Sequence, residues 1–342
     1  MTTQEKIKQE IQGTTLGHNE TNKSWQYLTW GGLIVVVIAL LIAPQMISNY
    51  FLFVLSLWAI TTIAAQGLNL TMGFAGQISL AQAAFMGIGA YSSVLLVKTA
   101  GLNFWLAMFI AFVICMLIGV AIGFPALRVE GHYLAFVTLG FNELVVLVVR
   151  NEDQWTGGPL GILDIERPSI FGYSLFEPVR YYYFCIIMLG IVSLAVWYML
   201  RSPWGRAFKA LRDNPNRARS LGLNTRTYTL LAFAIGSGLA GLAGVMLAPL
   251  IEFIDPNSFI LLRSLEFLLM VMVGGRGTLA GPFIGAFFAE VLPEWLRFAQ
   301  DYYLIFFGIL VMLIIVFFPQ GIAGFGTYIR KRFFSEQSKE GA

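Results

Sequence analysis

Polar and ionisable side chains that could bind a small solute stand inside otherwise apolar runs of this sequence. They are Asn69, Gln77, Ser79 and Gln82, then Thr138, Asn142 and Glu143, and finally Glu266. Amide and hydroxyl groups could hold the two ends of a zwitterion, or could bind neighbouring helices instead. An ionisable group at membrane depth is costly, so it usually faces a cavity or a partner. These residues are candidates for a solute pathway; a structural role for Glu143, and an ion pair of Glu266 with Arg263 or Arg276, are the alternatives.

Signatures of catalysis do not accompany these residues. The phosphate-binding pattern G-x-x-x-x-G-K-[S/T] is missing, since the dipeptide Gly-Lys does not occur in the chain. No Ser-His-Asp or H-E-x-x-H arrangement is found, and the two cysteines, Cys115 and Cys185, fall inside apolar runs. We therefore predict a protein that is not an enzyme, with no catalytic residue, no metal site and no bound cofactor. If it works as a pump, its nucleotide site belongs to a partner.

Two glycine-interrupted segments occupy corresponding places in the two halves of the chain. "MGFAGQISLAQAAFMGIGA" begins with the pair Gly73 and Gly76, and "VGGRGTLAGPFIGAFFA" contains the pair Gly274 and Gly277. Paired breaks of this kind indicate the transport path of a membrane transporter, because unwound backbone and half-helix ends line cavities there. The pattern predicts helix breaks near 67–77 and 273–282 and favours an inverted repeat; shared packing needs are the alternative.

The elements that must position these groups are membrane helices. The chain has 342 residues, of which 57% are hydrophobic and 12% are charged. This composition predicts an all-α, polytopic membrane protein with about ten spanning or re-entrant helices of ~20 residues each. The expected spans lie at roughly 29–47, 50–66, 74–97, 103–124, 133–149, 181–200, 227–248, 260–275, 278–292 and 303–319.

The distribution of positive charge predicts the orientation. The loop 201–226 carries a cluster of Lys and Arg against one acid, Asp213, whereas acids outnumber arginines in the loop 150–180. By the positive-inside rule, loop 201–226 and both termini are expected in the cytoplasm. The expected organisation is a polar cytoplasmic segment (1–28), a transmembrane permease domain (29–326) and a cytoplasmic tail (327–342). The net charge of +3 gives no indication of nucleic-acid binding.

The basic loop itself has a regular pattern, "GRAFKALRDNPNRARSLGLN". Ala207, Phe208 and Leu211 fall at helical spacing, Pro215 interrupts the helix, and a second short helix is expected to end at Gly222. A helix, a turn and a second helix at the membrane surface form a shape on which a partner can dock; a simple positive-inside anchor is the alternative. The candidate docking residues are Gly205, Arg206, Lys209, Arg212, Asp213, Ala218 and Gly222.

Five blocks of the sequence resemble those of permeases from branched-chain amino acid ABC importers, and the M-type (LivM-type) subunit fits best. They are "QGLNLTMGFAGQISLAQAAFMGIGAY", "GHYLAFVTLGFNELV" with "WTGGPLGI", the basic loop, "LMVMVGGRGTLAGPFIGA" and "FFPQGIAGF". The resemblance covers residues 50–326. It implies a permease subunit of the bacterial inner membrane that moves leucine, isoleucine and valine.

The same resemblance implies partners: an H-type permease, two cytoplasmic ATPase subunits that bind ATP and Mg, and a periplasmic substrate-binding protein. Loop 201–226 would be the coupling loop, with Ala218 and Gly222 supplying its Ala-x3-Gly core. Related permeases act on urea, short amides or aromatic acids, which stay open as substrates. Alternatives of another class are an ion-coupled secondary transporter that uses Glu143 and Glu266, and a channel.

Overall fold

A computed structural model describes residues 38–126, 132–170 and 173–295, together with 308, 312–313, 316–317 and 321–324. The chain divides into two compact units, Met1–Leu52 and Phe53–Ala342. In the first unit, the described residues form a helix over 38–46 and the beginning of α2 (Asn49–Leu68). The predicted segments 1–28 and 327–342, the first part of the predicted span 29–47 and most of the predicted span 303–319 lie outside the described residues.

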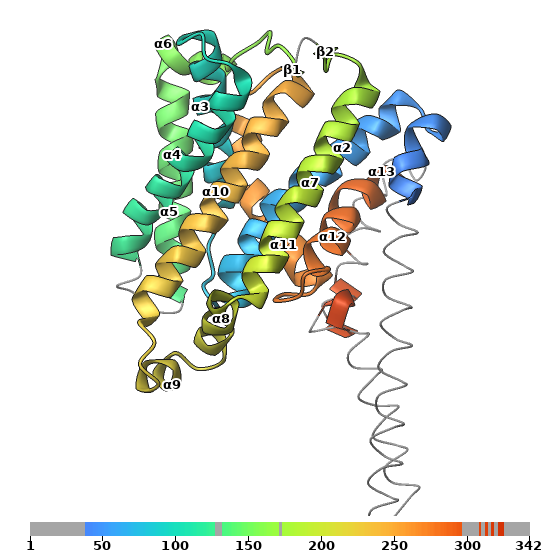
Figure 1. Ribbon diagram of the computed structural model, residues 1–342. Helices are drawn as coiled ribbons and strands as arrows, with labels where there is room; N and C mark the ends of the chain where they lie inside the picture. Colours follow the sequence, from blue (N-terminus) through green and yellow to red (C-terminus); the bar gives the residue numbers. More distant parts are fainter. Residues whose placement is uncertain are drawn as a thin grey trace, which may run out of the picture. The chain divides into compact units, whose positions relative to one another are not determined.

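Long apolar helices make up the second unit (Figure 1). They are the remainder of α2, which continues into the π-helix η1 (Asn69–Phe74), then α3 (Gln82–Lys98), α4 (Phe104–Ala126), α5 (His132–Asn151), α7 (Pro178–Arg201), α10 (Thr225–Ile251) and α11 (Leu261–Gly274). Within the described residues, six helical stretches are long and apolar enough to cross a membrane. The helical fold is confirmed; the predicted count of about ten spans and the inverted repeat are not.

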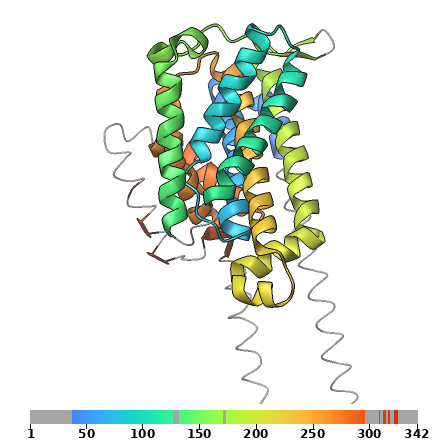
Figure 2. The same cartoon turned by 90° about the vertical axis from the view of Figure 1, so that its left-hand side faces the viewer.

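Short elements lie at the two ends of this helical unit (Figures 1 and 2). One end carries α8 (Pro203–Asp213) and α9 (Pro215–Ser220), and we call it the α8 end. The other carries α6 (Asp153–Thr156), the 3-10 helix η2 (Gly158–Leu160) and the two-residue strands β1 (Ser169–Ile170) and β2 (Tyr173–Ser174). We call it the hairpin end. The basic and the acidic loops therefore occupy opposite ends, as the charge pattern requires.

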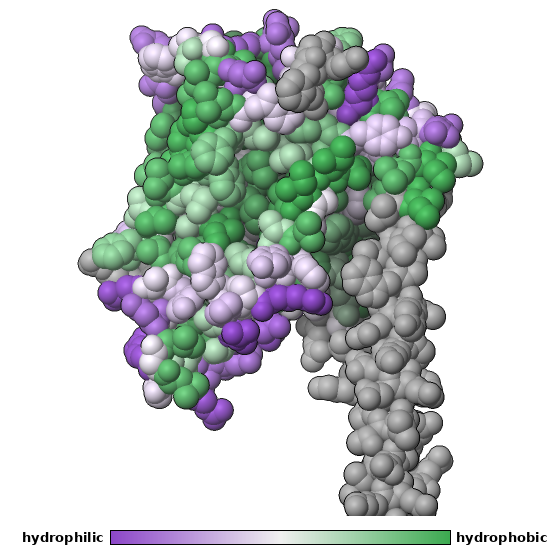
Figure 3. Space-filling model, viewed as in Figure 1, coloured by the Kyte–Doolittle hydropathy of each residue, from purple (hydrophilic) through white to green (hydrophobic). Residues whose placement is uncertain are grey.

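The remaining described elements follow α10. A 3-10 helix, η3 (Pro256–Phe259), precedes α11, and three short elements follow it: α12 (Gly281–Ala286), the π-helix η4 (Phe287–Val291) and α13 (Leu292–Trp295). The surface between the two ends is apolar (Figure 3). On α5, for example, Phe136 is 69% exposed. Such surfaces suit lipid or a second membrane protein better than water.

The centre of the unit is α10, which packs against α3, α4 and η1 and meets the end of α2 at Gly67. Small residues allow these backbones to approach closely. Gly236 of α10 lies against the carbonyl of Gly67, and Gly244 lies against the carbonyl of Met86. A side chain at Gly244 would overlap that carbonyl oxygen. Because apolar burial drives little association between helices in lipid, this close backbone packing holds α10 in place.

The first helix break differs from its predicted position. The helix persists through Phe74 because η1 widens by one residue per turn and keeps its backbone bonded, with the amide of Ala75 donating to the carbonyl of Leu70 at 3.0 Å. The break therefore covers 75–81, and α3 begins at Gln82 rather than near residue 74. The second break falls where expected, between the end of α11 at Gly274 and the start of α12.

Candidate functional site

The N-terminus of α3 begins inside the helical unit rather than at its surface. α3 has 17 residues, or about 25 Å of helix, which is shorter than a ~30 Å hydrocarbon core. Its first amide groups bond to side chains of other helices. The Leu80 amide donates to Thr138 Oγ1 at 2.9 Å, the Ala83 amide to Ser264 Oγ at 3.0 Å, and the Ala84 amide to Asn142 Oδ1 at 3.0 Å. These bonds satisfy backbone groups that lipid cannot.

Three fully buried side chains form this cap: Thr138 and Asn142 of α5, and Ser264 of α11. Four residues apart, Thr138 and Asn142 lie on one face of α5. Ser264 Oγ donates to Asn142 Oδ1 at 3.1 Å, and Asn142 Nδ2 donates to the Phe259 carbonyl at 3.4 Å. The candidates Thr138 and Asn142 are thus held by backbone in this conformation. Sequence reasoning missed Ser264, whose signal is a hydroxyl inside an apolar run.

Replacing Ser264 with Ala is expected to destabilise the protein by about 1–3 kcal/mol, because the buried Ala83 amide would lose its acceptor. The measurement is thermal unfolding of the detergent-solubilised protein. Ser92→Ala is the matched control, since among the described residues the Ser92 hydroxyl donates within its own helix, to the carbonyls of Ile88 and Gly89. Equal unfolding temperatures for the two variants would contradict the capping role of Ser264.

Asn69 joins the two helix breaks. Its Nδ2 donates to the Thr278 carbonyl at 2.8 Å, and its Oδ1 accepts from the Gly277 amide at 2.8 Å. Gly73 lies beside this contact, where any side chain would overlap Asn69 and Gly277. The second glycine of each break, Gly76 and Gly277, has a positive φ of 73° and 72°. Segments more than two hundred residues apart in sequence therefore meet at one point, which we call the break junction (Asn69, Gly73, Gly76, Gly277 and Thr278).

The other candidates near the first break have mixed surroundings. Gln82 is buried and donates from Nε2 to the Ala64 carbonyl at 2.6 Å, and Ser79 is buried with its Oγ 3.4 Å from the Ala81 amide that donates to it. Gln77 is partly exposed. Gly274 packs against Gly281 and Gly285 of α12 rather than in the junction.

Glu266 takes part in an ion pair, with Arg263 of the same helix rather than with Arg276. The Arg263–Glu266 distance is 2.5 Å, and Arg263 also contacts Glu290 of η4 at 2.8 Å. The Arg263 and Glu290 side chains are 22% and 10% exposed, so the second pair is largely desolvated. Sequence reasoning did not name Glu290, although an acid in the apolar run "FFAEVLP" is the signal that marks it.

Glu143 lies apart from the other candidates. It is exposed on α5, on a different face from Thr138 and Asn142, among exposed apolar side chains that include Phe136 and Leu147. Gly140, one turn away, has open space where a side chain would be. A carboxylate on the flank of a spanning helix is unfavourable against lipid. This face of α5 therefore requires a polar neighbour or water at Glu143.

The helix-turn-helix predicted for loop 201–226 is present. Ser202 caps α8 by accepting from the Trp204 amide, and Asn214 caps α9 by accepting from the Arg217 amide. Pro215 is the first residue of α9, and Gly222, with φ of 83°, follows its end. The buried residues are Gly205, Ala207, Phe208, Leu211 and Ala218, whereas Arg206, Lys209, Arg212, Asp213, Arg217 and Arg219 are exposed.

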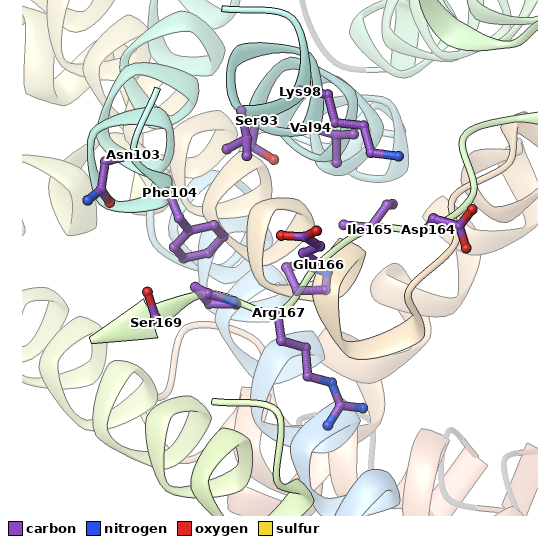
Figure 4. A pocket seen from close by; sticks show the side chains of 13 residues that line it. Ser93, Val94, Lys98, Asn103, Phe104, Asp164, Ile165, Glu166, Arg167 and Ser169 are labelled. Atoms are coloured by element: carbon purple, nitrogen blue, oxygen red, sulfur yellow. The ribbon is translucent and has the colours of Figure 1, made fainter. Parts of the chain in front are cut away.

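A hollow of ≈ 430 Å³ opens at the hairpin end, between α3 and the segment 164–169 (Figure 4). Both signs of charge line it. The carboxylate of Glu166 points towards the middle of the view and Lys98 lies on the α3 side. Lys98 Nζ donates to the Leu163 carbonyl at 2.5 Å, and Arg167 pairs with Glu252 at 3.0 Å. Sequence reasoning did not name this hollow, whose walls combine apolar side chains with a few charged and polar ones.

Apolar helices of spanning length, a half-helix capped inside the protein and a surface helix-turn-helix at one end together define a multi-pass membrane permease. The comparison with protein families agrees. The chain belongs to the family described as branched-chain amino acid transport system permease component, whose family model matches residues 50–316.

The chain is similar to permeases of known systems. It is 34% identical over 313 residues to the high-affinity branched-chain amino acid transport system permease protein LivM of Escherichia coli K12, covering 84% of this chain and 74% of that protein. It is 24% identical over 273 residues to the autoinducer 2 import system permease protein LsrC of Salmonella typhimurium, covering 75% of this chain and 74% of LsrC. No solved structure matches the chain. The expected resemblance to M-type permeases is confirmed.

Proposed function

We propose that this chain is the M-type permease subunit of an ATP-driven importer for leucine, isoleucine and valine. The importer comprises an H-type permease, two ATPase subunits that bind ATP and Mg, and a periplasmic binding protein, in a bacterial inner membrane. Both termini and the α8 end face the cytoplasm. The similarity to LivM supports branched-chain amino acids as the substrate class. Because the chain is also similar to LsrC, which is named for autoinducer 2 import, the substrate has to be measured.

The observation that carries this proposal is the surface of α8 and α9. Their apolar residues pack against the membrane helices, with the Phe208 ring 6.4 Å from that of Tyr228 of α10. Their basic side chains and Leu221, which is 81% exposed, point outwards. An exposed leucine in a rigid, charged surface element suits a hydrophobic anchor surrounded by polar contacts, which is the usual composition of a protein interface. We assign this surface to the ATPase subunit.

The exposed face of α5 suits the H-type permease. A paired permease would cover the apolar side chains around Glu143 and would provide the polar neighbour or water that its carboxylate needs. Solute would then pass between the two permeases, with Glu143 close to the path. A structural role for Glu143 at the subunit interface is consistent with the same placement.

Reconstitution tests the proposal. The chain and its co-encoded partners would be purified as a complex, placed in liposomes with the binding protein, and supplied with ATP and radiolabelled solutes. We expect ATP-dependent uptake of leucine, isoleucine and valine, and no uptake of urea or phenylalanine. Uptake of a different solute would replace the substrate assignment. Uptake by the chain alone on an ion gradient would overturn the importer in favour of a secondary transporter.

Leu221→Asp is expected to lower binding of the ATPase subunit at least about tenfold, or ~1.4 kcal/mol, because it replaces the apolar anchor with a charge. The measurement is the amount of ATPase subunit that is recovered with the tagged permease. Leu160→Asp is the matched control, since Leu160 is also 81% exposed but lies at the hairpin end. Equal recovery with both variants would exclude Leu221 from the docking surface.

A further inference from the structure

A charged side chain of α8, Arg212, contacts the break junction. Arg212 Nη1 donates to the Gly73 carbonyl at 3.1 Å, across 139 residues of sequence. The Cα, Cβ and Cγ atoms of Arg212 lie against Gly76, and its guanidinium lies where a side chain at Gly277 would stand. One residue of the surface helix-turn-helix therefore contacts both helix breaks.

The site at which Arg212 binds is the C-terminal end of a long helix. α2 and η1 form one helical stretch that ends at Phe74. The last carbonyls of a helix lack partners within it and carry partial negative charge, so a cation there is favourable. The neighbouring Asp213 orients the guanidinium, with Oδ1 3.4 Å from both Nε and Nη2 of Arg212. Arg212, a residue of α8, thus binds the C-terminal end of a different helix.

Asn69 bridges the breaks with two hydrogen bonds, and the left-handed Gly76 and Gly277 give the backbone room to turn there. Because Gly76 and Gly277 have no side chains, the two breaks can separate at these positions without moving a side chain past packed neighbours. Displacement of α8 would act directly on this junction, because the Arg212–Gly73 hydrogen bond joins α8 to the end of η1.

We infer that Arg212 is the positioning residue through which movement of α8 opens and closes the junction between the two helix breaks. This inference rests on the proposed function, in which ATPase subunits move α8. It assigns to Arg212 a role distinct from that of its basic neighbours. Arg206, Lys209, Arg217 and Arg219 belong to the docking surface, whereas Arg212, although also exposed, donates to the Gly73 carbonyl and transmits the motion.

The test compares solute uptake with ATP hydrolysis in the reconstituted complex. Arg212→Gln is expected to lower the number of solute molecules imported per ATP at least about tenfold, with ATP hydrolysis per complex within about twofold of the wild type. Arg212→Lys keeps a charged donor and is expected to restore part of this ratio. Arg226→Gln, which removes an exposed positive charge from the start of α10, outside α8 and α9, is the matched control and is expected to leave the ratio unchanged.

Other outcomes would overturn the inference in distinguishable ways. Uptake and hydrolysis that fall together in Arg212→Gln, or a loss of assembled complex that Arg212→Lys does not restore, would make Arg212 a structural residue. An unchanged ratio in Arg212→Gln would show that the bond to Gly73 transmits nothing. A wild-type complex without ATP-dependent uptake would overturn the proposed function together with this inference.

Discussion

Gly244→Val is expected to prevent recovery of folded protein. Gly244 lies at a close approach of α10 and α3, against the carbonyl of Met86 and the amide of Ala90. A β-branched side chain would overlap backbone atoms, which cannot rotate away as a flexible side chain can. Overpacking a well-packed core typically costs about 1–3 kcal/mol. Here two helices would have to separate along their length, so we expect a loss at or above the upper end of that range.

The measurement is the monodisperse fraction after detergent extraction and size-exclusion chromatography. Gly190→Val is the matched control, because Gly190 also lies within a long membrane helix, α7, but nothing lies within 4 Å of an added Cβ there. It makes the same change in helix propensity and lipophilicity. We expect near wild-type recovery from Gly190→Val. Comparable recovery from Gly244→Val would mean that α10 does not pack on α3 as closely as described.

Arg263→Leu is expected to destabilise the protein by about 3–5 kcal/mol, the usual cost of removing one partner from a buried ion pair. The Arg263 contact to Glu290 is 2.8 Å long, and the Glu290 side chain is only 10% exposed. Without the guanidinium, the Glu290 carboxylate has to stay charged in apolar surroundings or take up a proton. Thermal unfolding of the detergent-solubilised protein measures the loss.

A second substitution separates the ion pair from simple packing. In Arg263→Leu with Glu290→Leu, no unpaired buried charge remains, and replacing a whole buried pair with apolar residues is often neutral. We expect the double variant to regain most of the lost stability. Glu266, whose side chain is 40% exposed, is much less buried than Glu290. A double variant as unstable as Arg263→Leu would show that the guanidinium contributes through packing on the Phe267 ring, 5.3 Å away.

Local patterns in the sequence predicted local structure well. The helix-turn-helix of loop 201–226 follows from Pro215, Gly222 and the spacing of Ala207, Phe208 and Leu211, all of which act within a few residues. The second break follows from its glycines for the same reason. The first break was predicted too early in the chain. The π-helix η1 keeps the backbone hydrogen-bonded through Phe74, and no residue pattern in the sequence distinguishes such a π-helix from a break.

Contacts between distant segments could not be predicted in the same way. Asn69, Thr138 and Asn142 were selected as polar groups in apolar runs, but a polar group that caps a broken helix and one that binds solute look alike in a sequence. Their partners in the structure are backbone groups of the breaks, which no residue type marks. The roles of the candidates in a solute pathway stay predictions, as does that of Glu143, whose neighbours would belong to another chain.

The hydrogen bond between Asn69 and Gly277 cannot form until the ribosome has synthesised Gly277. Its two residues are separated by 208 positions; at roughly 5–20 residues per second, the ribosome needs about 10–40 seconds to make the second partner after the first. During this time the Asn69 side chain, at the end of α2 and the start of η1, lacks the backbone groups with which it will pair. Thr138 and Asn142 emerge much sooner, so the start of α3 gains most of its cap early. A segment that is made late therefore completes the end of α2 and η1, which are made early. A nascent chain truncated before Gly277 would leave the Asn69 amide exposed to lipid, to water or to the insertion machinery.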